Sequence, residues 1–344
     1  MLTCIIIRKF VSFHISLLMI PQSVPCMITG VNHLPVTQNL NQNAFNASAM
    51  DILTRLNNGE EVRVAIDCEG FQLGYHSHSL GILQIAECFK SGFPSSNSSH
   101  VSIELQQGFL IKTPFSQQTT TYLSNILSHK NIKIIMFGCT CDIPAILEEG
   151  VNLNIKAIID GQTYSIDRPK SLKDTIGIAT NCVEYNNALR SLATKDEINF
   201  DLFYYQNKDK PDPFSIMLTQ RFWNYSGNDI GLTAIGLMGA LRMTSFENLI
   251  RSSNIKTQKI YDLIQRHGYI APACENGFQY SPPYINGRIP NMEVALKLYV
   301  RCCLIEENFN LYQLFAPWDK KLSLNQIRQG KSKALNYIRN QRFY

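Results

Sequence analysis

"VRVAIDCEG" occupies residues 62–70, where a run rich in valine and isoleucine ends in two carboxylates. Such a short run of β-branched residues predicts a buried strand. Because side chains two apart in a strand point to the same side, Asp67 and Glu69 share one face at its carboxyl end. Ligands of open α/β sheets bind at that end. The stretch therefore predicts a buried strand that delivers two carboxylates to a site.

The segments around this strand predict the fold class. Two more apolar runs, "LGILQIAECF" and "VSIEL", follow it after short connections and predict an antiparallel meander of three strands. Downstream, helical and strand patterns alternate, which is typical of parallel β-α-β units. The helical patterns are 115–129 and 142–151, and the strand patterns are 132–138 and 155–160. We expect an α/β fold whose mixed sheet is flanked by helices.

The second half of the chain reads as helical. Residues 220–243 form one long, largely apolar helix, which we expect to be buried against the sheet. Beyond it, 253–268 and 291–315 read as helices, and the Pro/Gly-rich stretch 272–290 reads as a loop between them. The division that follows has three parts. They are an N-terminal segment of undecided status at 1–45, a central α/β domain at 46–245 and a mainly helical C-terminal extension at 246–344.

Composition sets bounds on the class of protein. The 344 residues are 45% hydrophobic and 17% charged, which indicates a globular chain rather than a disordered one. A net charge of +5 is too small to demonstrate a nucleic-acid partner. From Lys320 to the end there are seven Lys/Arg and no Asp/Glu, so this run is a solvated helix face, a loose tail or a phosphate contact. Ten scattered cysteines without zinc spacing favour reduced thiols in an intracellular protein of the cytoplasm or nucleus.

The N-terminal stretch "MLTCIIIRKFVSFHISLLMI" leaves three readings open. Its apolar run is interrupted by Arg8, Lys9 and His14, which makes it too short for a comfortable bilayer span. It is a targeting segment, an extra strand or an incorrectly placed start. Organelle targeting therefore remains open, and no stable membrane association is expected.

Three further polar residues accompany the first carboxylate pair. Asp142 lies between a predicted strand and a predicted helix, and Tyr225 and Asp229 lie four apart, on one face of the long helix. Taken singly, each has an ordinary reading: a polar turn for Asp67 and Glu69, a helix N-cap for Asp142 and core packing for Tyr225. Carboxylates that converge without a cation repel one another, and an oxygen-only cluster suits Mg²⁺ or Mn²⁺.

The motif order Asp67-x-Glu69, Asp142 and Tyr225-x-x-x-Asp229 resembles the DEDD superfamily of 3′–5′ exonucleases, in its tyrosine-bearing branch with ribonuclease D. The resemblance covers about residues 60–245. "LGILQIAE" and "IIDGQ" are similar to further family strands. "DCEGFQLGYHSHSLGILQIA" resembles the subgroup that contains Egalitarian and exonuclease 3′–5′ domain-containing protein 1.

The resemblance implies a ribonuclease H-like fold and a two-metal hydrolysis of the 3′-terminal phosphodiester to nucleoside monophosphates. Carried over, Asp67, Glu69 and Asp229 hold one Mg²⁺ or Mn²⁺, and Asp67 bridges to a second ion that Asp142 holds through water. Tyr225 orients the attacking water or helps to deprotonate it. The substrate's terminal nucleotide is expected at Gly70, where the backbone allows close approach, and Phe71.

Some stretches depart from the family pattern. The arginine usual before the last helix is missing, and "DPF" stands at 212–214 instead. This absence puts the anchoring of substrate or helix in doubt. "FGCTC" at 137–141 replaces a version that commonly contains histidine, and the Ser-rich turn at 91–100 has no counterpart. None of these departures removes an expected metal ligand.

Two functions of different classes remain after this reading. The first is a metal-dependent 3′–5′ exonuclease, acting on RNA in preference to DNA, a preference that only the subgroup resemblance implies. The alternative is a catalytically weak or inactive RNA-binding adaptor that keeps the exonuclease fold. Partners are a single-stranded 3′ end and, through the C-terminal extension, other proteins. The complete set of four acids and a tyrosine favours the enzyme.

Overall fold

The structure is a computed structural model that describes residues 13–18, 42–88, 100–105, 108–165, 170–179, 183–192, 200–207, 209, 220–280, 282 and 285–341. Most of the N-terminal segment, the Ser-rich turn at 91–99 and residues 212–214 lie outside them. Among the described helices, none is long and apolar enough to cross a membrane.

A five-stranded sheet forms the centre of the fold, in the order β5-β3-β2-β6-β7. Its strands are β2 Val62–Gly70, β3 Leu80–Glu87, β5 Gly108–Lys112, β6 Ile132–Met136 and β7 Ile158–Asp160. The pairs β2–β3 and β3–β5 are antiparallel, whereas β2–β6 and β6–β7 are parallel. The mixed sheet expected from the sequence is therefore confirmed.

The third strand of the predicted meander was assigned to the wrong residues. The "VSIEL" run forms β4 His100–Leu105, which pairs antiparallel with β1 Phe13–Leu18 in a separate two-stranded sheet. The third strand of the meander is β5, which follows β4 almost directly. Both runs are short and apolar, so their periodicity alone does not tell which one pairs with β3. Of the three readings of the N-terminus, β1 agrees with an extra strand.

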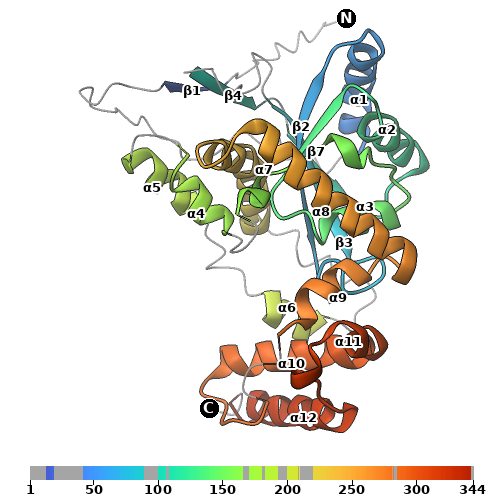
Figure 1. Cartoon of the computed structure of the whole chain (residues 1–344), viewed down its shortest axis with the longest axis vertical. Helices are drawn as coiled ribbons and strands as arrows, with labels where there is room; N and C mark the ends of the chain where they lie inside the picture. Colours follow the sequence, from blue (N-terminus) through green and yellow to red (C-terminus); the bar gives the residue numbers. More distant parts are fainter. Residues whose placement is uncertain are drawn as a thin grey trace, which may run out of the picture.

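Helices cover both faces of the sheet (Figure 1). On one face, α1 Gln42–Asn57, α2 Gln117–Leu127 and α3 Asp142–Glu148 pack with Val64, Ile66 and Cys68 of β2 in one core cluster. On the other face, α7 Gln220–Leu241 packs with Ala65 of β2 in a second cluster. The remaining elements before α8 are η1 Ile155–Ala157, η2 Gly161–Tyr164, α4 Leu172–Ile176, α5 Val183–Leu192 and α6 Phe200–Asn207.

Helix α8 Phe246–His267 lies against the sheet although the sequence division assigned it to the extension. Its Ile260 and Ile264 belong to the core with β2 and α1, and Leu249 belongs to the core under α7. A serine cap begins the helix, since Ser245 accepts a hydrogen bond from the amide of Asn248. The boundary at 245/246 stays a prediction, but α8 packs in the same cores as the sheet.

The rest of the extension is a helical lobe at the foot of the sheet (Figure 1). It consists of α9 Ala271–Phe278, α10 Met292–Glu307, α11 Phe309–Phe315, η4 Trp318–Lys320 and α12 Leu324–Gln341. Two expectations were wrong here: α9 lies inside the predicted loop, and the predicted helix over 291–315 is divided into α10 and α11. The break comes at Asn308, whose side chain donates to the carbonyl oxygens of Leu304 and Tyr75.

The basic run near the C-terminus lies largely on α12. One side of this helix is buried through Ile327, Gly330, Ala334 and Ile338, so α12 is amphipathic rather than a loose tail. Arg328 and Lys331, which flank this buried side, form ion pairs with Glu306 of α10. A phosphate contact by the run stays a prediction.

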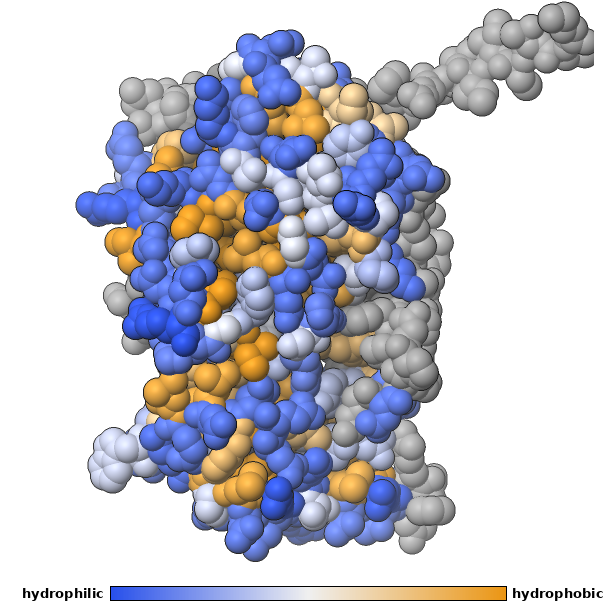
Figure 2. Space-filling model, turned by 90° about the vertical axis from the view of Figure 1, so that its right-hand side faces the viewer, coloured by the Kyte–Doolittle hydropathy of each residue, from blue (hydrophilic) through white to orange (hydrophobic). Residues whose placement is uncertain are grey.

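The face of the molecule to the right in Figure 1 is mixed in character. Figure 2 shows hydrophilic residues over most of it and hydrophobic residues gathered in patches across its middle. Apolar atoms ordinarily contribute more than half of the accessible surface of a folded protein, so these patches do not by themselves indicate a binding site.

Candidate active site

Three carboxylates converge where β2 meets α7. Asp67 and Glu69 end β2 on the face that α7 covers, and Asp229 comes from α7 itself. Their ligand oxygens all lie within 4.8 Å of one another. Glu69 is 6% exposed and Asp229 7%, so the negative charges are concentrated away from bulk water. Alternation along β2 places them together, because Ala65, Asp67 and Glu69 share one face.

Gln84 supports this cluster, although the sequence analysis gave it no role. It lies directly opposite Asp67 in the β2–β3 pair, and its Nε2 donates a 3.3 Å hydrogen bond to Asp67 Oδ2. Gln84 is completely buried. A glutamine in an otherwise apolar strand is the signal that could have revealed it, because a buried amide needs partners. The contact fixes the orientation of the Asp67 carboxylate.

Tyr225 lies one helical turn before Asp229, on the same face of α7, and is 6% exposed. Burial raises its pKa, and the nearby charges of Glu69, Asp229 and Asp67 raise it further. The protonated phenol is therefore the form that faces the carboxylates. Its ring packs in one cluster with Phe71 and with the helical lobe.

Asp142 lies on the other side of β2. It is the first residue of α3, is 8% exposed, and is not among the three carboxylates that converge. It faces Cys68, the residue between Asp67 and Glu69. Burial is the main cause of the raised pKa of the Cys68 thiol, and the charge of Asp142, together with a hydrogen bond to it, raises this pKa further. The expected N-cap role is not seen, because Cys141 occupies that position without a side-chain bond. Asp142 as a water-mediated ligand stays a prediction.

A buried ion pair holds the loop that leads into α3. Asp160, fully buried at the end of β7, accepts hydrogen bonds from the backbone amides of Gly138 and Cys139 and from Lys256 Nζ at 2.6 Å. Burial opposes ionisation of Asp160, yet Lys256 and the amides hold its pKa below the ordinary value. This geometry gives Asp160 a structural role, because it ties the end of β7 to α8 and to the loop before α3. Lys256 of α8 was not expected from the sequence.

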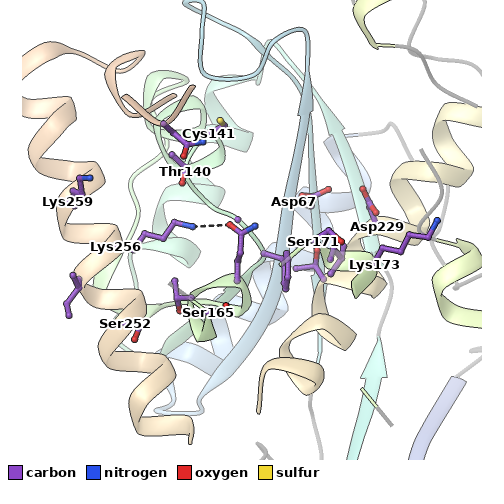
Figure 3. Close-up of a pocket in the computed structure, with 18 residues that line it drawn as sticks. Asp67, Thr140, Cys141, Ser165, Ser171, Lys173, Asp229, Ser252, Lys256 and Lys259 are labelled. Atoms are coloured by element: carbon purple, nitrogen blue, oxygen red, sulfur yellow. Dashed lines mark hydrogen bonds between the residues drawn. The ribbon is translucent and has the colours of Figure 1, made fainter. Parts of the chain in front are cut away.

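The donor set fits a hard divalent cation. Carboxylate oxygens are the ligands that Mg²⁺ and Mn²⁺ prefer, and a cation between Asp67, Glu69 and Asp229 would relieve their mutual repulsion. The thiols nearby are poor alternatives, because thiolates are soft ligands whereas Mg²⁺ and Mn²⁺ prefer oxygen. Asp67 and Asp229 also line a pocket of about 880 Å³ that extends toward α8 (Figure 3). An ion here would be open to a ligand in that pocket.

The two residues expected to contact substrate both have packing roles. A Cβ at Gly70 would overlap the carbonyl oxygen of Ser79, across the turn that joins β2 to β3. Phe71 is 7% exposed, inside the cluster that contains Tyr225. Their contact with a terminal nucleotide stays a prediction.

Replacing Gly70 by alanine is expected to destabilise the fold by about 1–3 kcal/mol, because the added methyl group displaces backbone rather than a flexible side chain. The turn resists this shift, since Ser79 Oγ accepts a 2.8 Å bond from the amide of Gly74. Urea unfolding of both proteins measures the difference. If the two proteins unfold with equal urea midpoints and equal slopes, the Ser79 carbonyl moves away from the added methyl group without loss of stability, and the prediction is wrong.

Comparison with known proteins gives two findings. The model of a family described as 3′-5′ exonuclease matches residues 45–242, which is more than half of the chain. Among solved structures, the catalytic core of RRP6 from Trypanosoma brucei is similar with a TM-score of 0.40 and 11% identity, covering 91% of this chain and 82% of that one. No curated protein sequence matches the chain significantly.

Proposed function

The chain belongs to the 3′-5′ exonuclease family, and from this premise we propose that it is a metal-dependent 3′–5′ exonuclease that releases nucleoside monophosphates. The single observation that carries the proposal is the convergence of Asp67, Glu69 and Asp229 from two elements far apart in the sequence. Three crowded carboxylates, two of them buried, destabilise a fold unless a cation compensates them. A cation held by this cluster would supply the chemistry of phosphodiester hydrolysis.

Each site residue has a part in the proposed reaction. Asp67, Glu69 and Asp229 would hold one divalent ion, and Asp67 and Asp142 would hold a second ion, Asp142 through water. Bound ions of this kind lower the pKa of a water and offset the charge that builds on the phosphate. Tyr225, a protonated phenol beside the carboxylates, orients the attacking water by a hydrogen bond. Gln84 keeps the Asp67 carboxylate in position, as partners of metal ligands commonly do.

RNA is the preferred substrate in this proposal, and the Egalitarian-like subgroup is the proposed place of the chain in the family. The support for both is the resemblance of residues 67–86 to that subgroup, whereas the complete set of acids and the tyrosine supports catalytic activity. An adaptor that only binds RNA has no need of this full set.

Labelled single strands test the proposal directly. Purified protein is incubated with RNA and DNA of one sequence, labelled at either end, in Mg²⁺, Mn²⁺ or EDTA. We expect stepwise shortening from the 3′ end, faster on RNA, that EDTA abolishes. If the protein binds the strands but shortens them in neither metal, the exonuclease proposal is wrong and the adaptor function is supported. Equal rates on both strands would remove the RNA preference alone.

A further inference from the structure

Helix α8 carries a stripe of side chains, the α8 stripe, on a different side from the residues that it buries in the core. Ser252, Ile255, Lys256 and Lys259 recur at the spacing of one helical face. All four line the pocket that holds Asp67 and Asp229 at its opposite side (Figure 3). The family match ends at residue 242, so this wall of the pocket comes from outside the matched region.

The chemistry of this wall differs from that of the carboxylate side. Lys259 is 61% exposed and forms an ion pair with Glu275 of α9 at 2.8 Å. Lys256 is tied to Asp160 and lies 3.5 Å from Gln162 Oε1, the contact drawn as a dashed line in Figure 3. Ile255 is 65% exposed and adds an apolar side chain to the lining of the pocket. Cation, hydroxyl and apolar surface therefore lie together.

We propose that the α8 stripe binds the single strand just upstream of the scissile phosphate, with Lys259 on a backbone phosphate and Ile255 against a base or ribose. The inference rests on the proposed function, which places the 3′-terminal linkage at Asp67 and Asp229. A strand that leaves those carboxylates through the pocket meets α8 next. The volume of about 880 Å³ is larger than one nucleotide requires, and the hydroxyls of Thr140, Ser165 and Ser252 add donors for phosphate oxygens.

The ion pair between Lys259 and Glu275 provides a test, because replacing each partner is expected to change the affinity for a single strand in the opposite direction. Binding of a labelled octanucleotide with phosphorothioates at its 3′-terminal linkages is measured by anisotropy in Mg²⁺. We expect Lys259→Ala to weaken binding roughly 3- to 10-fold and to reduce the salt slope by about 0.7, the value for one contact with a single strand. Glu275→Gln removes the competing carboxylate and should tighten binding about 2-fold.

Lys297→Ala is the matched control, because Lys297 is 53% exposed and pairs with Glu293 on α10, outside the pocket. It should leave affinity and salt slope unchanged. If Lys259→Ala binds like the control, or if Glu275→Gln weakens binding, the inference is overturned. Shortening of labelled RNA by the wild type decides the proposed function separately, because strand binding is measured here without cleavage.

Discussion

Asp67→Asn is expected to lower the rate of metal-dependent shortening by about 10³-fold or more. Asp67 is the carboxylate proposed to contact both ions, so its loss affects the activation of the water and the stabilisation of the leaving oxygen together. Asparagine keeps an oxygen in place to accept the hydrogen bond from Gln84, so the change removes charge with little loss of packing. Initial rates on 5′-labelled RNA measure the effect.

The same variant has a predicted effect on stability that separates a metal site from a structural one. Mg²⁺ or Mn²⁺ should raise the melting temperature of the wild type, because an ion that binds only the folded state stabilises it by mass action. Asp67→Asn should lose this shift, yet melt no lower than the wild type in EDTA, because one of three crowded charges is gone. A full metal-induced shift in the variant would mean that the site is misassigned.

Asp51→Asn provides the matched control. Asp51 has a side chain that is 76% exposed and pairs with Arg55 on α1. Exposed pairs of this kind contribute about 0–1 kcal/mol, so the control should keep both activity and the metal-induced shift.

An element could be predicted from the sequence where the spacing of residues within that element alone decides which side chains share a face. Strand β2 and helix α7 carry Asp67, Glu69, Tyr225 and Asp229 at spacings that place them on single faces, and the structure brings these four side chains together. The third strand of the meander could not be predicted, because two apolar runs compete and the partner of β4 is about ninety residues away, in β1.

The placement of Asp142 was also beyond the sequence. Its position after a strand predicts that it lies near the carboxyl edge of the sheet, but not on which side of β2. The side depends on α3 packing with Cys68 and the α1–α2 layer, a tertiary contact with no local signal. Long-range polar pairs are hidden for the same reason, and Lys256 is 96 residues from Asp160.

Lys256→Met is expected to destabilise the protein by about 3–5 kcal/mol, the typical cost of leaving one buried charge without its partner. Asp160 has no solvent exposure, and the Lys256 side chain is 24% exposed. Urea unfolding at pH 7 measures the loss. Lys297→Met, which breaks an exposed pair on α10, should cost under about 1 kcal/mol.

The pH dependence of this loss follows from the Asp160 carboxyl. In the wild type its pKa lies below the ordinary value, so its contribution is present above that ordinary value and is lost as the pH falls through the lowered one. Without Lys256, burial dominates and raises the pKa of Asp160, so the folded variant takes up a proton as the pH falls toward 4. The gap between wild type and variant should therefore narrow from pH 7 to pH 4.

A double variant distinguishes an unpaired charge from lost packing. Asp160→Asn in the Lys256→Met background removes the buried charge and keeps an oxygen for the amides of Gly138 and Gln162, which both donate to Asp160 Oδ1. It should recover most of the stability, since replacing a buried pair costs much less than breaking it. If the double variant is as unstable as Lys256→Met, the contribution of Lys256 is its packing between α8 and β7, and the charge of Asp160 does not set the cost.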